Sequence, residues 1–306
     1  MALYFRVAVF LLLGSVHVLS SSVSASYVGA VVEHTVYFGD KSDSSDYLLE
    51  VNIEQYEQLI HLSKSQSAQV VVFPEFGLTP VEAEQRSDLY PYIEVIPEVN
   101  QSHPINPCEA PSEFEDAPIL LRMSCAARSN GILVLVNMID KQECSPAVDS
   151  DCPGDGHYQY NTDVVFDESG NMIAKYHKSH EWVSLKVAYD QPKTPSEISF
   201  LSSFGVEFGL FICFDIMFED PPKVLRSRGV KHFLYAVMQG DIGERLLIEP
   251  WSKNNQATVL SANLGSGEKK DCSAIIVNGT VLDSKKYYLE SDLFPHDNIV
   301  VATIPV

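Results

Sequence analysis

The sequence is poor in positive charge. Its 306 residues contain 21 Lys and Arg against 41 Asp and Glu, which gives a formal net charge of −20. Binding to nucleic acid or to anionic lipid relies on clustered Lys and Arg side chains, so this composition disfavours both kinds of partner. We therefore expect no nucleic-acid partner.

The sequence also lacks a hydrophobic run of bilayer length, an internal repeat and a Pro/Gly/Ser-rich linker. A transmembrane helix needs about 20 apolar residues, whereas the apolar run near the amino terminus covers only residues 7–13. Hydrophobic residues make up 45% of the chain and charged residues 20%, which is a balance that supports a large buried core. With no linker to divide it, residues 26–306 are expected to form one large domain.

The first 25 residues have the pattern of a secretory signal peptide. Arg6 precedes the apolar run, and small residues follow it up to Val23-Ser24-Ala25. Cleavage after Ala25 is expected, which makes the mature protein secreted and extracellular; a buried amino-terminal helix is the alternative. Two glycosylation sequons fit a secreted surface, Asn100-Gln101-Ser102 and Asn278-Gly279-Thr280.

Six cysteines are present, and disulfides are expected in an oxidising compartment. Cys144 and Cys152 flank a loop with Pro and Asp residues where the chain can fold back on itself, and Cys108 and Cys125 bracket another largely polar stretch. We predict that each pair forms a local disulfide. The state of Cys272 stays open.

The hydrophobic pattern predicts a layered α/β fold, because apolar β-branched runs alternate with helix-like segments. Strands are expected at residues 26–36, 69–73, 131–139, 163–166, 172–176, 206–214, 231–237, 258–262, 273–277, 281–283 and 299–304. Helices are expected at residues 48–65, 118–129, 221–228 and 245–255.

Three polar or nucleophilic residues follow apolar runs or lie near their ends. Glu75 comes after the buried-strand pattern Val70-Val71-Val72-Phe73-Pro74, at the strand end where α/β sheets gather ligands. Lys178 leaves the second strand of a hairpin, and Cys213 lies near the end of another apolar run. Taken singly, each has a plain structural alternative: a solvated loop acid, a surface lysine and a small core residue.

Taken together, these residues resemble a known catalytic set. Phe73-Pro74-Glu75, Tyr176-His177-Lys178 and Cys213-Phe214-Asp215 have the order and approximate spacing of the Glu-Lys-Cys triad of the nitrilase (carbon–nitrogen hydrolase) superfamily. The stretches at residues 27–34, 158–167 and 213–221 are similar to its vanin/biotinidase branch, and the resemblance covers about residues 26–230.

The resemblance implies a nitrilase-type α-β-β-α sandwich of two mixed sheets with outer helices, and a hydrolase for linear, non-peptide amides. Cys213 would be the nucleophile, Glu75 the general base and acid, and Lys178 together with the backbone N–H of Phe214 the oxyanion donors. A thioester would link the two half-reactions, with no metal or organic cofactor. The products implied are pantothenate plus cysteamine, or biotin plus lysine or a lysyl peptide.

Three departures from that branch bear on activity. Relatives carry a second orienting glutamate several residues after the lysine, and here the only nearby acid, Glu181, comes early. Two outcomes stay open: Glu181 acts as the orienting acid, or that position is lost. The segment after the next strand, Ala236-Val237-Met238-Gln239-Gly240-Asp241, differs from the Pro-Thr-Ala-Trp type that lines the pocket of vanin-like members. Those members continue into a further β-rich domain, so a short form, a fragment and a divergent member all stay open.

Other functions also stay open. A secreted pseudoenzyme would use the same fold to bind a small amide or a protein, and a disulfide-containing storage protein would need no site. A Cys-His protease is disfavoured because no Asn or Asp partner pattern accompanies Cys213. A metal site is disfavoured because His157, His177 and His180 lack a ligand spacing. The sequence does not decide between a monomer and a homodimer.

Overall fold

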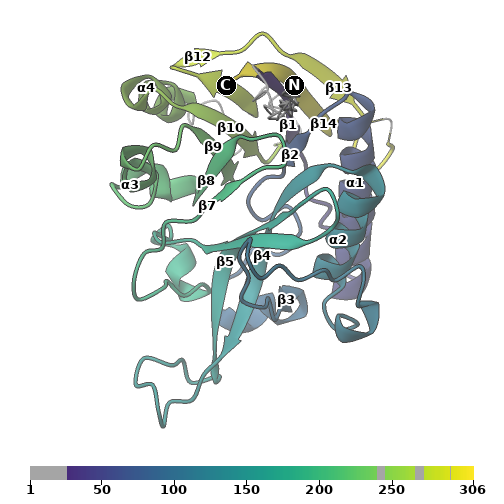
Figure 1. The fold of residues 1–306 in the computed structure, drawn as a ribbon. Helices are drawn as coiled ribbons and strands as arrows, with labels where there is room; N and C mark the ends of the chain where they lie inside the picture. The colour runs from purple at the N-terminus through teal and green to yellow at the C-terminus, as the bar shows by residue number, and fades with distance from the viewer. Residues whose placement is uncertain (1–25, 240–244, 266–271, 290) are drawn as a thin grey trace, which may run out of the picture.

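The computed structural model describes residues 26–239, 245–265, 272–289 and 291–306. Two mixed β-sheets lie face to face, and a pair of helices covers the outer face of each sheet (Figure 1). The predicted α-β-β-α sandwich is therefore confirmed. The signal peptide predicted for residues 1–25 lies outside the described residues. None of the helices in the described ranges combines the length and the hydrophobicity of a membrane-spanning segment.

Eight of the described strands form the first sheet, which includes β1 (Ser26–Glu33). Its path runs in the order β13 (Lys285–Tyr288), β14 (Asn298–Pro305), β1 (Ser26–Glu33), β2 (Val70–Val72), β4 (Leu133–Glu143), β5 (His157–Phe166) and β6 (Met172–His177), while β3 (Ile93–Glu94) also pairs with β4. Strands β1, β2 and β4 are parallel, and β5 and β6 continue antiparallel. Strands β2, β4 and β6 therefore end at the same edge.

The second sheet holds six strands. Their order is β12 (Thr280–Val281), β11 (Ala274–Val277), β10 (Thr258–Asn263), β9 (His232–Val237), β8 (Glu207–Ile212) and β7 (Ser199–Leu201). The three central strands β8, β9 and β10 are parallel. Strands β11 and β12 form a hairpin whose two-residue turn is Asn278-Gly279, with both residues at positive φ, as a tight hairpin turn requires.

In the described ranges, four helices form the outer layers, and local sequence signals set the start of two of them. Helix α1 (Ser45–Ser65) begins after Ser44, whose hydroxyl accepts the Tyr47 N–H, and α2 (Pro118–Asn130) begins at a proline, which needs no acceptor there. Both cover the first sheet, whereas α3 (Pro222–Ser227) and α4 (Arg245–Asn255) cover the second (Figure 1). The carboxylate of Glu94 in β3 accepts the N–H groups of Ile119 and Leu120 and so caps α2 from a distance.

The continuous apolar runs are explained by burial on both faces of each sheet, since successive side chains of a strand point to opposite faces. In β2, Val71 joins the core beneath α1 and α2, while Val70 and Val72 join the core between the two sheets. In β9, Leu234 points to the intersheet core and Phe233 to a third core beneath α3 and α4. Three apolar cores thus separate four layers.

Several predicted boundaries differ from the structure. Strand β1 ends at Glu33, before the predicted end at residue 36, and β5 begins at His157, six residues before the predicted start at 163. The polar first half of β5 is buried on one face, where hydrogen bonds satisfy side chains such as Gln159 and Asn161. The short strands β3, β7 and β13 were not predicted, because two to four residues show no clear period.

The run at 206–214 predicts a strand through Phe214, and this end is wrong. Strand β8 stops at Ile212, and residues Cys213–Met217 form a 3₁₀ helix, η4. Cys213 has a φ of 43°, in the left-handed region, so an extended strand cannot continue through it.

Both predicted disulfides are present. Cys108 is bonded to Cys125, which joins the approach to α2 to the helix itself, and Cys144 is bonded to Cys152 at the tip of the β4–β5 hairpin. Cys213 and Cys272 belong to neither bond.

Candidate active site

The three residues of the predicted triad line one pocket. Glu75 follows β2, Lys178 follows β6 of the same sheet, and Cys213 follows β8 of the other sheet. The pocket has a volume of about 610 Å³, and its remaining described walls are largely apolar: Trp182, Ser184, Leu185, Phe214, Ile216, Met217, Tyr235, Met238, Gln239 and Leu247. Residues far apart in the chain therefore meet where strands of the two sheets end.

Glu75 is buried, with 1% of its surface exposed, and both carboxylate oxygens have donors. Oε1 accepts a hydrogen bond from Nζ of Lys178 at 2.6 Å and from Nδ2 of Asn161 at 2.7 Å. Oε2 accepts the backbone N–H of Met238 at 3.1 Å. The carboxylate is thus held in one orientation by β5, the segment after β6 and the segment after β9.

Lys178 is buried between two carboxylates. Its Nζ lies 2.6 Å from Oε1 of Glu75 and 3.3 Å from Oε2 of Glu181, and 1% of the residue is exposed. Burial alone would lower the pKa of Lys178, but Glu75 and Glu181 outweigh it and raise that pKa well above its ordinary value. The lysine is therefore a fixed ammonium in the pocket wall.

Glu181 occupies the place beside the lysine that an orienting acid needs. Its side chain is buried, and burial raises its pKa to about 7, against the opposing effect of Lys178. Glu181 is only three residues from Lys178, so the short spacing still brings the acid to the ammonium.

Cys213 stands at a sharp turn between β8 and η4. Its left-handed φ costs a non-glycine residue about 1–3 kcal/mol, and such strain is found at functional positions. The carbonyl oxygen of Cys213 accepts the Tyr235 hydroxyl at 2.8 Å, which fixes the turn to β9. The next residue, Phe214, lies in the first turn of η4, where backbone N–H groups have no acceptor within the helix.

Two buried asparagines support Glu75, and neither was predicted as a site residue. Asn137 of β4 donates to Oδ1 of Asn161 at 2.8 Å and accepts the N–H of Phe76 at 2.9 Å. Asn161 of β5 in turn donates to Glu75. An asparagine inside the apolar run of β4 is a signal that could have identified the first of them, because buried polar groups need partners.

The segment that departs from the vanin/biotinidase pattern lies against the pocket. Ala236 and Val237 end β9, and Met238 and Gln239 line the pocket. Met238 also binds Glu75 through its backbone N–H, a contact that does not depend on side-chain identity. Gly240 and Asp241 lie outside the described residues.

The three histidines considered as metal ligands have separate environments. His157 bonds to Gln159, His177 bonds to Asp140, and His180 stacks on Phe218. Among the residues that the structure describes, no group of three or more His, Cys, Asp or Glu side chains is arranged to hold a metal ion.

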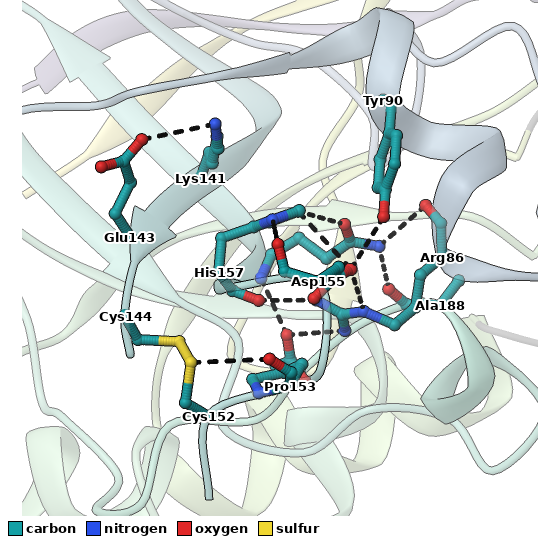
Figure 2. Close-up of polar contacts among 12 residues, drawn as sticks. Arg86, Tyr90, Lys141, Glu143, Cys144, Cys152, Pro153, Asp155, His157 and Ala188 are labelled. Atoms are coloured by element: carbon teal, nitrogen blue, oxygen red, sulfur yellow. Dashed lines mark hydrogen bonds and ion pairs between the residues drawn. A yellow bond between two sulfur atoms is a disulfide. The ribbon is translucent and has the colours of Figure 1, made fainter. Parts of the chain in front are cut away.

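Arg86 ties the disulfide-bonded hairpin to the loop that forms one pocket wall. Figure 2 shows its guanidinium beside Asp155, near the Cys144–Cys152 bond; Nε lies 2.7 Å from Oδ2 of Asp155, and Nη2 donates to the carbonyl of His157. Nη1 lies 2.8 Å from Oδ2 of Asp190, five residues after Leu185 of the pocket.

We predict that Arg86→Ala lowers the free energy of unfolding by about 2–3 kcal/mol, because four acceptor atoms on three residues lose a charged donor. The measurement is denaturant unfolding followed by circular dichroism. Arg128→Ala is the control, since Arg128 makes one exposed ion pair of 3.5 Å with Glu109 and such pairs contribute about 1 kcal/mol at most. An equal decrease in the free energy of unfolding of the two variants would show that the contacts of Arg86 stabilise the fold no more than an exposed ion pair does.

Two packed mixed sheets with outer helices, and a glutamate, a lysine and a cysteine meeting at their strand ends, define the carbon–nitrogen hydrolase class. The chain belongs to this family: the family model described as carbon-nitrogen hydrolase matches residues 43–258.

Curated proteins that are 34–37% identical to this chain include pantetheinases and biotinidases. The chain is 34% identical to the pantetheinase of Mus musculus over 266 residues, 83% of this chain and 50% of that protein. It is 37% identical to the pantetheinase of Sus scrofa over 68% of this chain and 40% of that protein. It is 34% identical to the biotinidase of Takifugu rubripes over 71% of this chain and 44% of that protein. The chain thus spans about half the length of the curated relatives it matches.

A solved structure supports the fold independently. An amidase from Nesterenkonia sp. superimposes with a TM-score of 0.62 over 92% of this chain and 91% of that chain, at 19% sequence identity. At this identity the likeness concerns the fold alone.

Proposed function

We propose that the protein is a secreted amidohydrolase that cleaves a linear, non-peptide carbon–nitrogen bond. The observation that carries the proposal is the convergence of Glu75, Lys178 and Cys213 on one pocket, from the ends of three strands in two sheets. Membership of the carbon-nitrogen hydrolase family supports it.

In the first half-reaction, Cys213 Sγ attacks the amide carbon while Glu75 takes the thiol proton. The oxyanion of the tetrahedral intermediate accepts hydrogen bonds from the Lys178 ammonium and the Phe214 N–H. Glu75 then gives its proton to the amine nitrogen, the C–N bond breaks, and the acyl group remains on Cys213 as a thioester.

In the second half-reaction, water takes the place of the amine. Glu75 removes a proton from this water, whose oxygen attacks the thioester carbon, and the same donors stabilise the second oxyanion. The C–S bond breaks, the carboxylic acid leaves, and the proton returns to the thiol. Glu181 is proposed to orient Lys178 in both steps, since its carboxyl group lies 3.3 Å from the ammonium. No step calls for a metal or an organic cofactor.

The substrate is proposed to be a pantetheine-type amide or a biotin amide. The support is the similarity to pantetheinases and biotinidases over two thirds or more of this chain. The small-molecule substrate would enter the 610 Å³ pocket, a size that suits a ligand of this class.

Incubation of the purified protein with a fluorogenic pantothenate amide and a fluorogenic biotin amide tests the proposal. Release of amine from one of them, measured by fluorescence, selects the substrate. Cys213→Ala should abolish the release, and Cys272→Ala is its matched control. Cys272 is the other cysteine outside the disulfides and does not line the pocket. The rate of amine release by Cys272→Ala should equal that of the unchanged protein. Release from neither amide would overturn the proposed activity and favour a binding function for the same pocket.

Secretion is proposed from the amino-terminal sequence together with two features of the structure, its disulfides and its exposed sequon asparagines. The two disulfides fit an oxidising compartment. The sequon asparagines Asn100 and Asn278 are exposed. Expression in a eukaryotic cell tests this: the medium should contain protein that begins at Ser26 and loses mass on enzymatic deglycosylation. Retention in the cell with an intact amino terminus would contradict it.

A further inference from the structure

Asp215 is a fully buried carboxylate that joins three separate segments next to the proposed catalytic residues. Its Oδ2 accepts the Ile212 N–H at 2.9 Å and the Tyr176 hydroxyl at 2.8 Å. Its Oδ1 accepts the His180 N–H at 2.9 Å. The donors come from the end of β8, from β6 and from the segment that follows β6.

The positions of these donors are informative. Ile212 immediately precedes Cys213, and Lys178 lies between Tyr176 and His180. Because β6 belongs to the first sheet and β8 to the second, the carboxylate connects the two sheets where they present the lysine and the cysteine. The Tyr176 hydroxyl also binds the side chain and backbone of Ser179, which tightens the same turn.

A local role accounts for only one of these three bonds. An acid at the third position of a helix commonly accepts the N–H of the residue that precedes the helix, as Asp215 does with Ile212. The bonds from Tyr176 and His180 come from β6 and from the segment that follows it, and they have no part in capping η4. A hydrophobic residue would be less costly at this fully buried position if only packing mattered.

The electrostatic surroundings of Asp215 also indicate a role beyond the capping of η4. Burial raises the pKa of Asp215 to about 7, while Lys178 and the three donors oppose that effect. Asp163 also faces this region and has its own pKa raised well above the ordinary value by burial. The Lys178 ammonium thus interacts with several buried carboxyl groups, Asp215 and Asp163 among them. The position of Asp215 therefore affects the position of the ammonium.

We propose that Asp215 is a positioning residue that holds the Lys178 turn and the Cys213 turn at the separation needed for reaction. The inference rests on the proposed function, because it assigns those two residues their catalytic roles. Asp215 itself does not touch the substrate; it acts through the backbone on either side of the two reacting side chains.

Asp215→Asn tests the proposal. An amide can accept from only one side, so in either orientation an NH₂ group faces a backbone N–H and one of the two turns is released. We expect kcat for the amide to fall by about 100-fold, since misplacement of about 1 Å costs this much. KM should change by less than about threefold.

Glu94→Gln is the matched control. Glu94 is also a buried carboxylate that accepts two backbone N–H groups, but those belong to α2, and Glu94 does not line the pocket. Both variants should have a lower melting temperature, while only Asp215→Asn should lose kcat per folded molecule. If Asp215→Asn does not fold, Tyr176→Phe keeps the carboxylate and both backbone bonds, and should lower kcat by about tenfold. Equal kcat values in the Asp215 or Tyr176 variant and in the Glu94 variant would overturn the proposal.

Alkylation of Cys213 by iodoacetamide separates this inference from the proposed function. Its rate, read by peptide mass mapping so that Cys272 is counted apart, depends on the thiolate and its neighbours and needs no amide substrate. We expect about tenfold slower alkylation in Asp215→Asn, because the thiol moves away from the Lys178 ammonium. If the unchanged protein hydrolyses no amide but Asp215→Asn slows alkylation, the proposed function fails and the positioning role stands. Unchanged alkylation would overturn the positioning role.

Discussion

Cys213→Ala is expected to reduce amide hydrolysis by at least about 10³-fold, the scale seen when a catalytic nucleophile is removed. Without the sulfur no thioester forms, and water would have to attack the amide directly. The fold should be kept, because Cys213 is only half-buried and alanine leaves the Tyr235 bond to its carbonyl in place. Steady-state amine release is the measurement, with circular dichroism to confirm folding.

Cys213→Ser sharpens this prediction. Serine keeps the size of the side chain but has a far less acidic hydroxyl, so it should also be nearly inactive even though the pocket is preserved. Activity in Cys213→Ala within tenfold of the unchanged protein would mean that another group attacks the substrate, and the assigned chemistry would be wrong.

Glu75→Gln is expected to lower kcat by about 10³-fold, because one residue makes each of the proton transfers in both half-reactions. The amide oxygen can still accept from Lys178 and Asn161, but an NH₂ group then faces the Met238 N–H. We therefore also expect a loss of about 1–3 kcal/mol in the free energy of unfolding. Lys178 keeps Glu181 as a second partner, which limits the structural damage.

Glu98→Gln is the control for Glu75→Gln. Glu98 also pairs with a lysine, Lys175, but its side chain is 81% exposed and it does not line the pocket. Its kcat should equal that of the unchanged protein. Pre-steady-state kinetics provide the decisive readout: Glu75→Gln should show no burst of amine, since acylation itself needs the base. A full burst followed by slow turnover would restrict Glu75 to the second half-reaction and contradict its assigned dual role.

The layered fold could be predicted because the sequence signal is strong where both faces of a strand are buried. The apolar run Val70-Val71-Val72-Phe73 is typical of a central strand buried on both faces, and the structure divides its side chains between two cores. The polar first half of β5 could not be predicted as a strand from its hydrophobic pattern, because its buried Gln159 and Asn161 depend on partners distant in sequence. Tertiary hydrogen bonds, and not local preference, decide that segment.

The sequence allowed the three candidate residues of the site to be named, but not the side chains that hold them in place. The resemblance to the nitrilase superfamily identified Glu75, Lys178 and Cys213, and the structure places all three on one pocket. That Lys178 lies 2.6 Å from a glutamate 103 residues away is a property of the fold, which no local pattern contains.

The backbone at Cys213 was missed for a related reason. An apolar run gives no sign that the chain turns into the left-handed region at its last residues. The turn is held by contacts from β9 and, through Asp215, from the other sheet, so its cause lies outside the run. Strain of this kind persists only where surrounding structure determines it.

The most direct test of the central claim is the intact mass of the protein, acid-quenched during turnover of a pantothenate or biotin amide. We predict a mass increase equal to the acyl group, located on the peptide that contains Cys213, and no such increase in Cys213→Ala. Amine release without any adduct on Cys213, and with release retained in Cys213→Ala, would contradict the thioester mechanism.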